Sequence, residues 1–133
     1  GPRALDIADP RDRARPALRL RIDGGSVATT ANSERGRRVD GRRLSHVLDP
    51  RTGASARDFG AVTVWAERAL DADALSTACF VLGPERALAL AEETPGVEVV
   101  VLRWRGPAGP LEARVSSGLR GRVTPLISDL QLP

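Results

Sequence analysis

The sequence predicts an α+β domain in which two consecutive helices lie on one side of a mainly antiparallel sheet. Three observations support this fold class. Short β-branched runs separated by turn signals come first, two adjacent stretches of helical spacing follow, and a pair of apolar runs around a Gly-Pro turn comes near the end. The length of 133 residues fits one domain.

The first predicted strands flank a glycine turn. Residues 18–22 alternate apolar and polar side chains with the period of a half-buried strand. The turn signal Asp23-Gly24-Gly25 and the short β-branched segment 26–30 come next, so we expect a hairpin there. The polar segment 32–41 is expected to be a loop, and residues 44–48 the next strand.

The two predicted helices are adjacent in the middle of the chain. A short buried strand at residues 62–65 precedes helical spacing over 66–82, and Gly83 ends that helix. Pro84 suits the first position of a second helix over 84–93, because the missing N–H of proline costs nothing there.

A closing hairpin is predicted after the helices. The continuous β-branched run 97–104 is typical of a central strand, and residues 111–115 return from the Gly-Pro turn. We expect the remainder, which ends in residues 125–133, to be a loose tail.

Composition limits the classes of function. All 20 basic residues are arginine, scattered among 17 acidic ones, and aromatic residues make up only 3%. This is unlike a nucleic-acid interface, where basic residues cluster with aromatic ones, so we expect no nucleic-acid partner. The longest apolar runs fall far short of the roughly 20 residues that span a bilayer, so no membrane span is expected. Cys79 alone cannot form an internal disulfide.

The helix over 66–82 carries a candidate metal site. On a helical wheel its apolar core stripe is Ala74, Leu75, Ala78, Cys79 and Leu82. The opposite side gathers Asp73, Ser76 and Thr77 with Phe80 and Val81, and we expect that side not to be solvated.

Asp73 and Thr77 are four residues apart, so their oxygens point the same way and can reach one hard cation such as Mg²⁺. The alternative is that Asp71 or Asp73 caps the helix and Thr77 bonds back to a helical carbonyl. Two ligands are too few for magnesium, so the others would come from water, phosphate oxygens or another segment.

The only histidine lies in the stretch LSHVLDPRTG, residues 44–53. Asp49 precedes a proline and is restricted to extended conformations, and Arg51-Thr52-Gly53 predicts a rigid turn with backbone amides available to an anion. An imidazole beside such a turn could act as a general base, which makes His46 the candidate. The alternative is a structural histidine with satisfied hydrogen bonds.

Taken together, LSHVLDPRTG and ADALSTACFVLG resemble the C-terminal half of the ApbE family, the FAD:protein FMN transferases. The segments SVATT, AVTVWA and PERALALAEE resemble neighbouring parts of that family, so the resemblance covers nearly the whole chain. The chain departs from the family pattern at Leu44, where Tyr or His is usual. It also departs at residues 29–33, which read TTANS where the family tends to read TSGDY.

The resemblance implies a magnesium-dependent transfer of FMN from FAD to a threonine hydroxyl of a target flavoprotein, with release of AMP. It implies that Asp73 and Thr77 are the magnesium ligands and that His46 is the base. The residues implied for the flavin-diphosphate site are His46, Val47, Asp49, Thr52 and Gly53, the last three by shaping the turn.

The resemblance also implies that residues 1–133 are the C-terminal portion of a larger domain. We therefore expect a separate N-terminal half to supply much of the FAD pocket and a further metal ligand, and localisation depends on that half: exported, membrane-anchored or cytoplasmic. The alternative, motivated by the altered residues 30–33, is a non-catalytic flavin-binding or flavoprotein-docking module. An arginine-rich nucleic-acid binder, whose DNA affinity would depend steeply on salt, ranks last.

Overall fold

The computed structural model describes residues 1–31, 37–39, 42–44, 48–54, 58–104 and 109–132. The strands are β1 (Pro2–Asp9), β2 (Asp12–Asp23), β3 (Ser26–Ala31), β4 (Arg37–Val39), β5 (Arg42–Leu44), β6 (Gly60–Ala66), β7 (Val97–Trp104), β8 (Leu111–Val115), β9 (Val123–Pro125) and β10 (Leu130–Gln131). The helices are α1 (Ala69–Leu82) and α2 (Pro84–Glu93), and a short 3-10 helix, η1, covers Ser117–Leu119.

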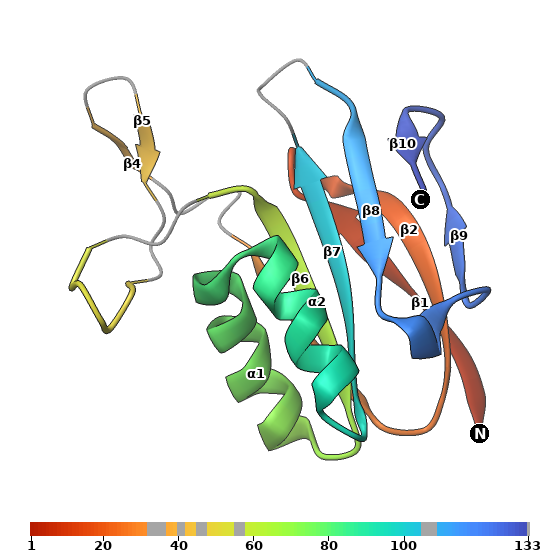
Figure 1. The fold of residues 1–133 in the computed structure, drawn as a ribbon. Helices are drawn as coiled ribbons and strands as arrows, with labels where there is room; N and C mark the ends of the chain where they lie inside the picture. Colours follow the sequence, from red (N-terminus) through yellow and green to blue (C-terminus); the bar gives the residue numbers. More distant parts are fainter. Residues whose placement is uncertain (32–36, 40–41, 45–47, 55–57, 105–108, 133) are drawn as a thin grey trace.

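The fold has three layers. A five-stranded sheet in the order β10-β8-β7-β6-β3 lies in the middle, α1 and α2 cover one face, and the sheet β1-β2-β9 lies against the other (Figure 1). Among the described strands, all pairings are antiparallel except that of β10 with β8. The predicted α+β class, with two consecutive helices on one side of a mainly antiparallel sheet, is confirmed.

The two central strands are buried on both faces because they separate two apolar cores. Val62 and Val64 of β6 face the helices, while Ala61 faces the three-stranded sheet. In β7, Val99 and Val101 face the helices, and the alternate residues face the other core. This two-sided burial explains why residues 99–102 of β7 are a continuous apolar run rather than an alternating one.

The expected hairpin at Asp23-Gly24-Gly25 is wrong. β2 pairs with β1 and β9, whereas β3 pairs with β6 in the other sheet, so the turn carries the chain from one layer to the next. The Trp65 indole donates to the Gly24 carbonyl oxygen at 2.9 Å and packs so closely that a β-carbon on Gly25 would overlap it. Long-range packing of Trp65 therefore decides the direction in which the chain leaves this turn.

The expected loose tail is also wrong. β9 pairs with β2, β10 pairs with β8, and Ile127 and Leu130 are buried in the core between the sheets. The N-terminal strand β1 was not expected at all. β9 gains its structure from a partner distant in sequence, which local signals do not reveal, whereas β1 pairs with the next strand along the chain, β2.

The strand expected at residues 44–48 is only partly described. β5 ends at Leu44 and pairs with β4 in a small separate sheet, and residues 45–47 lie outside the described ranges. No helix in the described part of the chain is long and apolar enough to span a membrane.

Helix α1 begins later than expected and buries a different stripe. Its buried residues are Ala72, Ser76, Cys79 and Phe80. Ala74 and Ala78, expected in the core, are exposed. Apolar residues occur on most sides of the helix, so the helical wheel did not distinguish a buried side from an exposed one. Packing on β3 and β6 decides which side is buried. Gly83 ends α1 and Pro84 begins α2, as predicted.

Candidate functional site

The predicted site residues fall into three groups. His46 and Val47 lie outside the described residues. Asp49, Thr52 and Gly53 lie in a turn within residues 48–54. Asp73 and Thr77 lie on α1. In Figure 1 the turn is in the yellow arm at the left, beyond the end of the sheet, and α1 lies on the sheet.

The turn is organised by Asp49. Its carboxylate accepts hydrogen bonds from the Arg51 backbone amide at 2.9 Å and from the Arg51 guanidinium at 3.1 and 2.9 Å. Its backbone carbonyl accepts from the amides of Thr52 at 3.2 Å and Gly53 at 2.8 Å. Gly53 has φ +71°, a value that glycine adopts without strain. Asp49, Thr52 and Gly53 therefore do shape the turn.

The expectation that these amides are available to an anion is wrong. The amides of Arg51, Thr52 and Gly53 all donate to Asp49, and the Ala54 amide donates to the Thr52 hydroxyl at 3.2 Å. The hydrogen bond from the Arg51 side chain, helped by that from its backbone amide, holds the pKa of the Asp49 carboxyl below its ordinary value. A ligand at this turn would meet side chains rather than a cradle of free amides.

Asp73 does not cap α1. The N-cap residue is Arg68, no side chain makes a capping hydrogen bond, and Asp73 is the fifth residue of the helix. Within the described ranges, no hydrogen bond or ion pair engages the Asp73 carboxylate, which is exposed. The capping alternative is therefore wrong for Asp73, whose carboxylate faces outward one turn before Thr77.

Hydroxyl groups connect α1 to β3. The Ser76 hydroxyl donates to the Asp73 backbone carbonyl at 2.9 Å, and the Thr30 hydroxyl lies 2.9 Å from Ser76 and 3.5 Å from the Thr77 hydroxyl. Ser76 is 1% exposed, Thr30 is half-buried and Thr77 is exposed. The sequence placed Ser76 beside Asp73 and Thr77 on the wheel, but it gave no sign of Thr30.

Thr77 does not bond back to its own helix. The Asp73 carbonyl, one turn earlier, accepts the Ser76 hydroxyl, and the only side-chain hydrogen bond of Thr77 in the described part of the chain is with Thr30. The oxygens of Asp73 and Thr77 are hard donors that suit Mg²⁺. No cluster of three or more His, Cys, Asp or Glu is found among the described residues. These residues therefore fit part of a magnesium site rather than a complete one.

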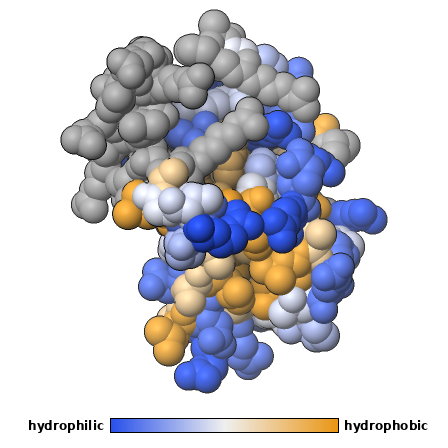
Figure 2. All heavy atoms as spheres, turned by 60° about the vertical axis from the view of Figure 1, so that its left-hand side comes forward, coloured by the Kyte–Doolittle hydropathy of each residue, from blue (hydrophilic) through white to orange (hydrophobic). Residues whose placement is uncertain are grey.

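An apolar strip borders this pair. Leu70 is 69% exposed, and Ala74 and Ala78, one and two turns further along α1, are exposed as well. Figure 2 brings the helix side forward and shows apolar atoms gathered on this face between polar rims. Asp73 and Thr77 thus lie beside exposed apolar side chains of the same helix.

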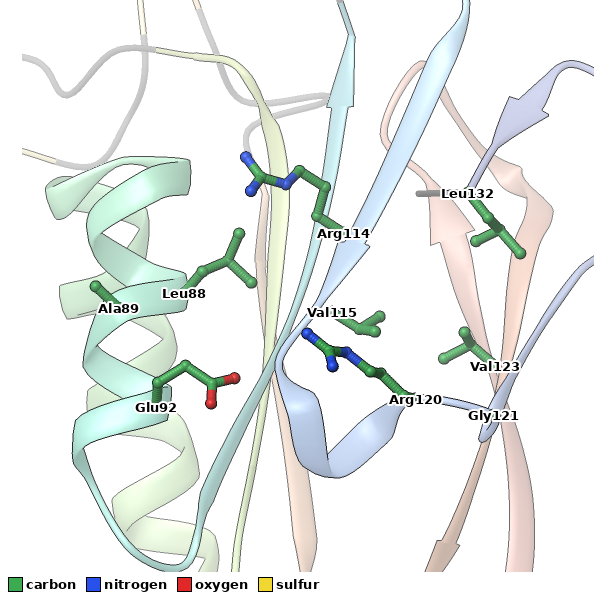
Figure 3. A pocket seen from close by; sticks show the side chains of 9 residues that line it. All are labelled: Leu88, Ala89, Glu92, Arg114, Val115, Arg120, Gly121, Val123 and Leu132. Carbon is green, nitrogen blue, oxygen red and sulfur yellow. The ribbon is translucent and has the colours of Figure 1, made fainter.

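A groove in the described part of the chain lies elsewhere. It has a volume of about 740 Å³ and runs between α2 and the segment from β8 to β9, with Arg114 and Arg120 projecting into it opposite Glu92 (Figure 3). None of the predicted site residues lines it. Glu92 is held by the amide and hydroxyl of Ser117 at 2.6 and 2.8 Å.

A model of the ApbE family matches residues 2–101. The chain belongs to the ApbE family. The FAD:protein FMN transferase of Treponema pallidum (strain Nichols) is 43% identical over 111 residues, which cover 79% of this chain and 31% of that protein. The FAD:protein FMN transferase of Escherichia coli (strain K12) is 45% identical over 67 residues, which cover 50% of this chain and 19% of that protein.

Solved ApbE structures share the fold. The ApbE protein of Thermotoga maritima superposes with a TM-score of 0.73 at 33% identity, covering 91% of this chain and 38% of that one. The apo flavinyl transferase ApbE of Pseudomonas stutzeri gives 0.71 at 33% identity, covering 92% and 37%. This ApbE chain thus spans about a third of the length of these relatives.

Proposed function

We propose that this ApbE chain is the C-terminal portion of a magnesium-dependent FAD:protein FMN transferase. The enzyme would move FMN from FAD to a threonine hydroxyl of a target flavoprotein and release AMP. The observation that carries the proposal is the pair of Asp73 and Thr77 on α1. Their side chains are exposed, and among the described residues neither is used for helix capping or back-bonding.

The proposed reaction is a diphosphate cleavage. The acceptor threonine oxygen bonds to the phosphorus of the FMN half, the P–O bond to the AMP half breaks, and AMP leaves with the bridging oxygen. His46 is the proposed base that takes the proton of the acceptor hydroxyl. His46 and Val47 would line the flavin-diphosphate site, and Asp49, Thr52 and Gly53 would hold the turn beside it.

The metal site would be shared. Asp73 and Thr77 would supply two oxygens, whereas Mg²⁺ takes six, so phosphate oxygens, water and another segment would complete the shell. When bound, the cation would neutralise charge on the phosphate oxygens during the cleavage. The role of this chain is to hold one carboxylate and one hydroxyl side by side on a helix that is fixed to the sheet.

The rest of the site would come from an N-terminal half. Two observations support this: the chain spans about a third of its relatives, and α1 exposes Leu70, Ala74 and Ala78 next to the proposed ligands. Apolar side chains on a helix are usually covered in an assembled protein. That half would cover this face and bring the missing ligand.

The test is magnesium-dependent release of AMP from FAD by this chain joined to its N-terminal half, together with transfer of FMN to a flavoprotein that has an acceptor threonine. Asp73→Asn and Thr77→Val should each abolish both reactions. Asp71→Asn is the matched control, an exposed carboxylate in the first turn of the same helix, and it should leave both unchanged. His46→Ala should lower turnover more than FAD binding.

The second candidate is a non-catalytic flavin-binding or flavoprotein-docking module. It is favoured by the closed turn at Asp49, whose neighbouring amides are satisfied internally and so do not await a phosphate. A correctly folded assembly that binds FAD or the flavoprotein but releases no AMP with Mg²⁺ present would support this candidate and contradict the transferase.

A further inference from the structure

We propose that Thr30 and Ser76 are positioning residues that orient the Thr77 hydroxyl as an oxygen ligand for a divalent cation. The inference rests on the proposed function, because it concerns the same pair of ligands on α1. It adds a β-strand residue and a buried serine, neither of which binds the cation itself.

The chain of hydroxyl groups has one direction. A carbonyl oxygen can only accept a hydrogen bond, so the Ser76 hydroxyl donates its single proton to the Asp73 carbonyl oxygen, 2.9 Å away. Ser76 must then accept from Thr30, whose hydroxyl lies 2.9 Å away. With its proton directed at Ser76, Thr30 can only accept from Thr77 across the 3.5 Å that separates their hydroxyl oxygens.

The direction matters for metal binding. A hydroxyl that binds a cation must offer a lone pair to it and send its proton elsewhere. Thr30 takes the Thr77 proton on the side of the strand, which leaves the Thr77 lone pairs for the exposed side. The competing acceptor for that proton in the preceding turn is the Asp73 carbonyl, and Ser76 already donates to it. Thr30 and Ser76 together therefore leave Thr77 as an acceptor.

The fold fixes this arrangement. Thr30 pairs with Val62 on β6, and Val62 belongs to the core beneath the helices, so the Thr30 side chain faces α1. Ser76 is buried, so water does not compete strongly at the inner end of the chain. Asp73 takes part at both ends, because its carbonyl receives the Ser76 proton and its carboxylate is the proposed neighbouring ligand.

Mn²⁺ is the probe for the test, since it takes the same oxygen ligands as Mg²⁺ and free Mn²⁺ is measured directly by electron paramagnetic resonance. The chain joined to its N-terminal half is titrated with Mn²⁺. We expect Thr30→Val and Ser76→Ala to weaken binding by about 10-fold or more, the usual effect of losing a residue that orients a ligand. Thr30→Ser keeps the hydroxyl and should retain the affinity.

The matched control is Thr29→Val. Thr29 is the neighbouring residue on β3, and its hydroxyl lies 2.7 Å from that of Thr63 on the sheet face away from the helices. This change removes the same group from the same strand but leaves the Thr30 chain intact, so Mn²⁺ affinity should not change. Circular dichroism of each variant confirms that it is folded.

A double variant separates orientation from general damage to the fold. If Thr30 acts through Thr77, then Thr30→Val should cause no further loss in a Thr77→Val background, whereas independent structural effects would add. Mn²⁺ affinity of Thr30→Val equal to that of the unaltered protein would overturn the proposal, as would additive losses or a folded assembly of the two halves that binds no Mn²⁺. The expected Mn²⁺ pattern without any AMP release would instead refute the transferase and leave the role of Thr30 standing.

Discussion

Replacing Phe80 by alanine should destabilise the protein far more than replacing Leu70, although both residues lie on α1. Phe80 is 1% exposed and its ring stacks on Phe59 with centroids 5.0 Å apart, whereas Leu70 is 69% exposed. A buried phenylalanine removes ~150–250 Å² from water, which is worth ~4–6 kcal/mol at ~25 cal/mol per Å². Because alanine retains the β-carbon, we expect Phe80→Ala to lower the free energy of unfolding by ~3–5 kcal/mol.

Leu70→Ala should change the free energy of unfolding by no more than about 0.5 kcal/mol, as surface substitutions usually do. Urea denaturation followed by far-ultraviolet circular dichroism gives both values, provided that the m-value stays constant. The comparison also tests which side of α1 is buried. A loss of unfolding free energy below about 1 kcal/mol for Phe80→Ala, or an equal loss for Leu70→Ala, would refute the packing described. Truncating a fully buried aromatic side chain destabilises a protein by more than that.

Three further predictions follow from local geometry. The hydrogen bonds from Arg51 to the ionised Asp49 carboxylate stabilise the turn at pH values above the ordinary aspartate pKa of about 3.9. This contribution is lost as the pH falls through the lower pKa that Asp49 has in the folded protein. Arg51→Gln should therefore raise the Asp49 pKa in a carboxyl NMR titration, and an unchanged value would contradict the contact. Gly60→Ala should cost more than about 1 kcal/mol in urea denaturation, because Gly60 has φ +143° and an added methyl would overlap the Leu102 carbonyl oxygen; wild-type stability would refute this. Burial raises the pKa of the Cys79 thiol to about 11, so iodoacetamide at pH 8 should label Cys79 only after unfolding, and rapid labelling of the folded chain would show that the thiol is accessible.

Local sequence signals predicted the elements whose ends are marked by proline or glycine. α2 begins at Pro84, as predicted, because a proline there needs no hydrogen-bond donor. β7 and β8 match their predicted ranges, since glycine and proline turn signals stand before β7 and between the two strands.

Elements defined by distant partners were not predictable in this way. β9 and β10 are short and their sequence is not strongly patterned, so only pairing with β2 and β8 makes them strands. The turn at Gly24 and Gly25 has the composition of a hairpin, but the Trp65 indole occupies the space beside it and the next strand joins the other sheet.

In the candidate site, too, the features set by local sequence were predictable and those set by distant contacts were not. The spacing of Asp73 and Thr77 was enough to place both on one side of a helix. Thr30 is 47 residues from Thr77, and it contacts α1 only because β3 lies at the sheet edge beneath that helix. The closure of the Asp49 turn upon itself was not visible either, because composition does not distinguish amides that are free from amides that are already bonded.

The pairing of β9 with β2 and of β10 with β8 has a consequence for folding during synthesis. Both sheets contain a strand from residues 123–131, so neither can be completed while that segment is still inside the ribosome. The earlier strands would wait with unpaired edges, a condition in which nascent chains tend to associate with one another or with chaperones. β9 and β10, which are translated after the strands they pair with, therefore set the earliest moment at which the two sheets can be completed.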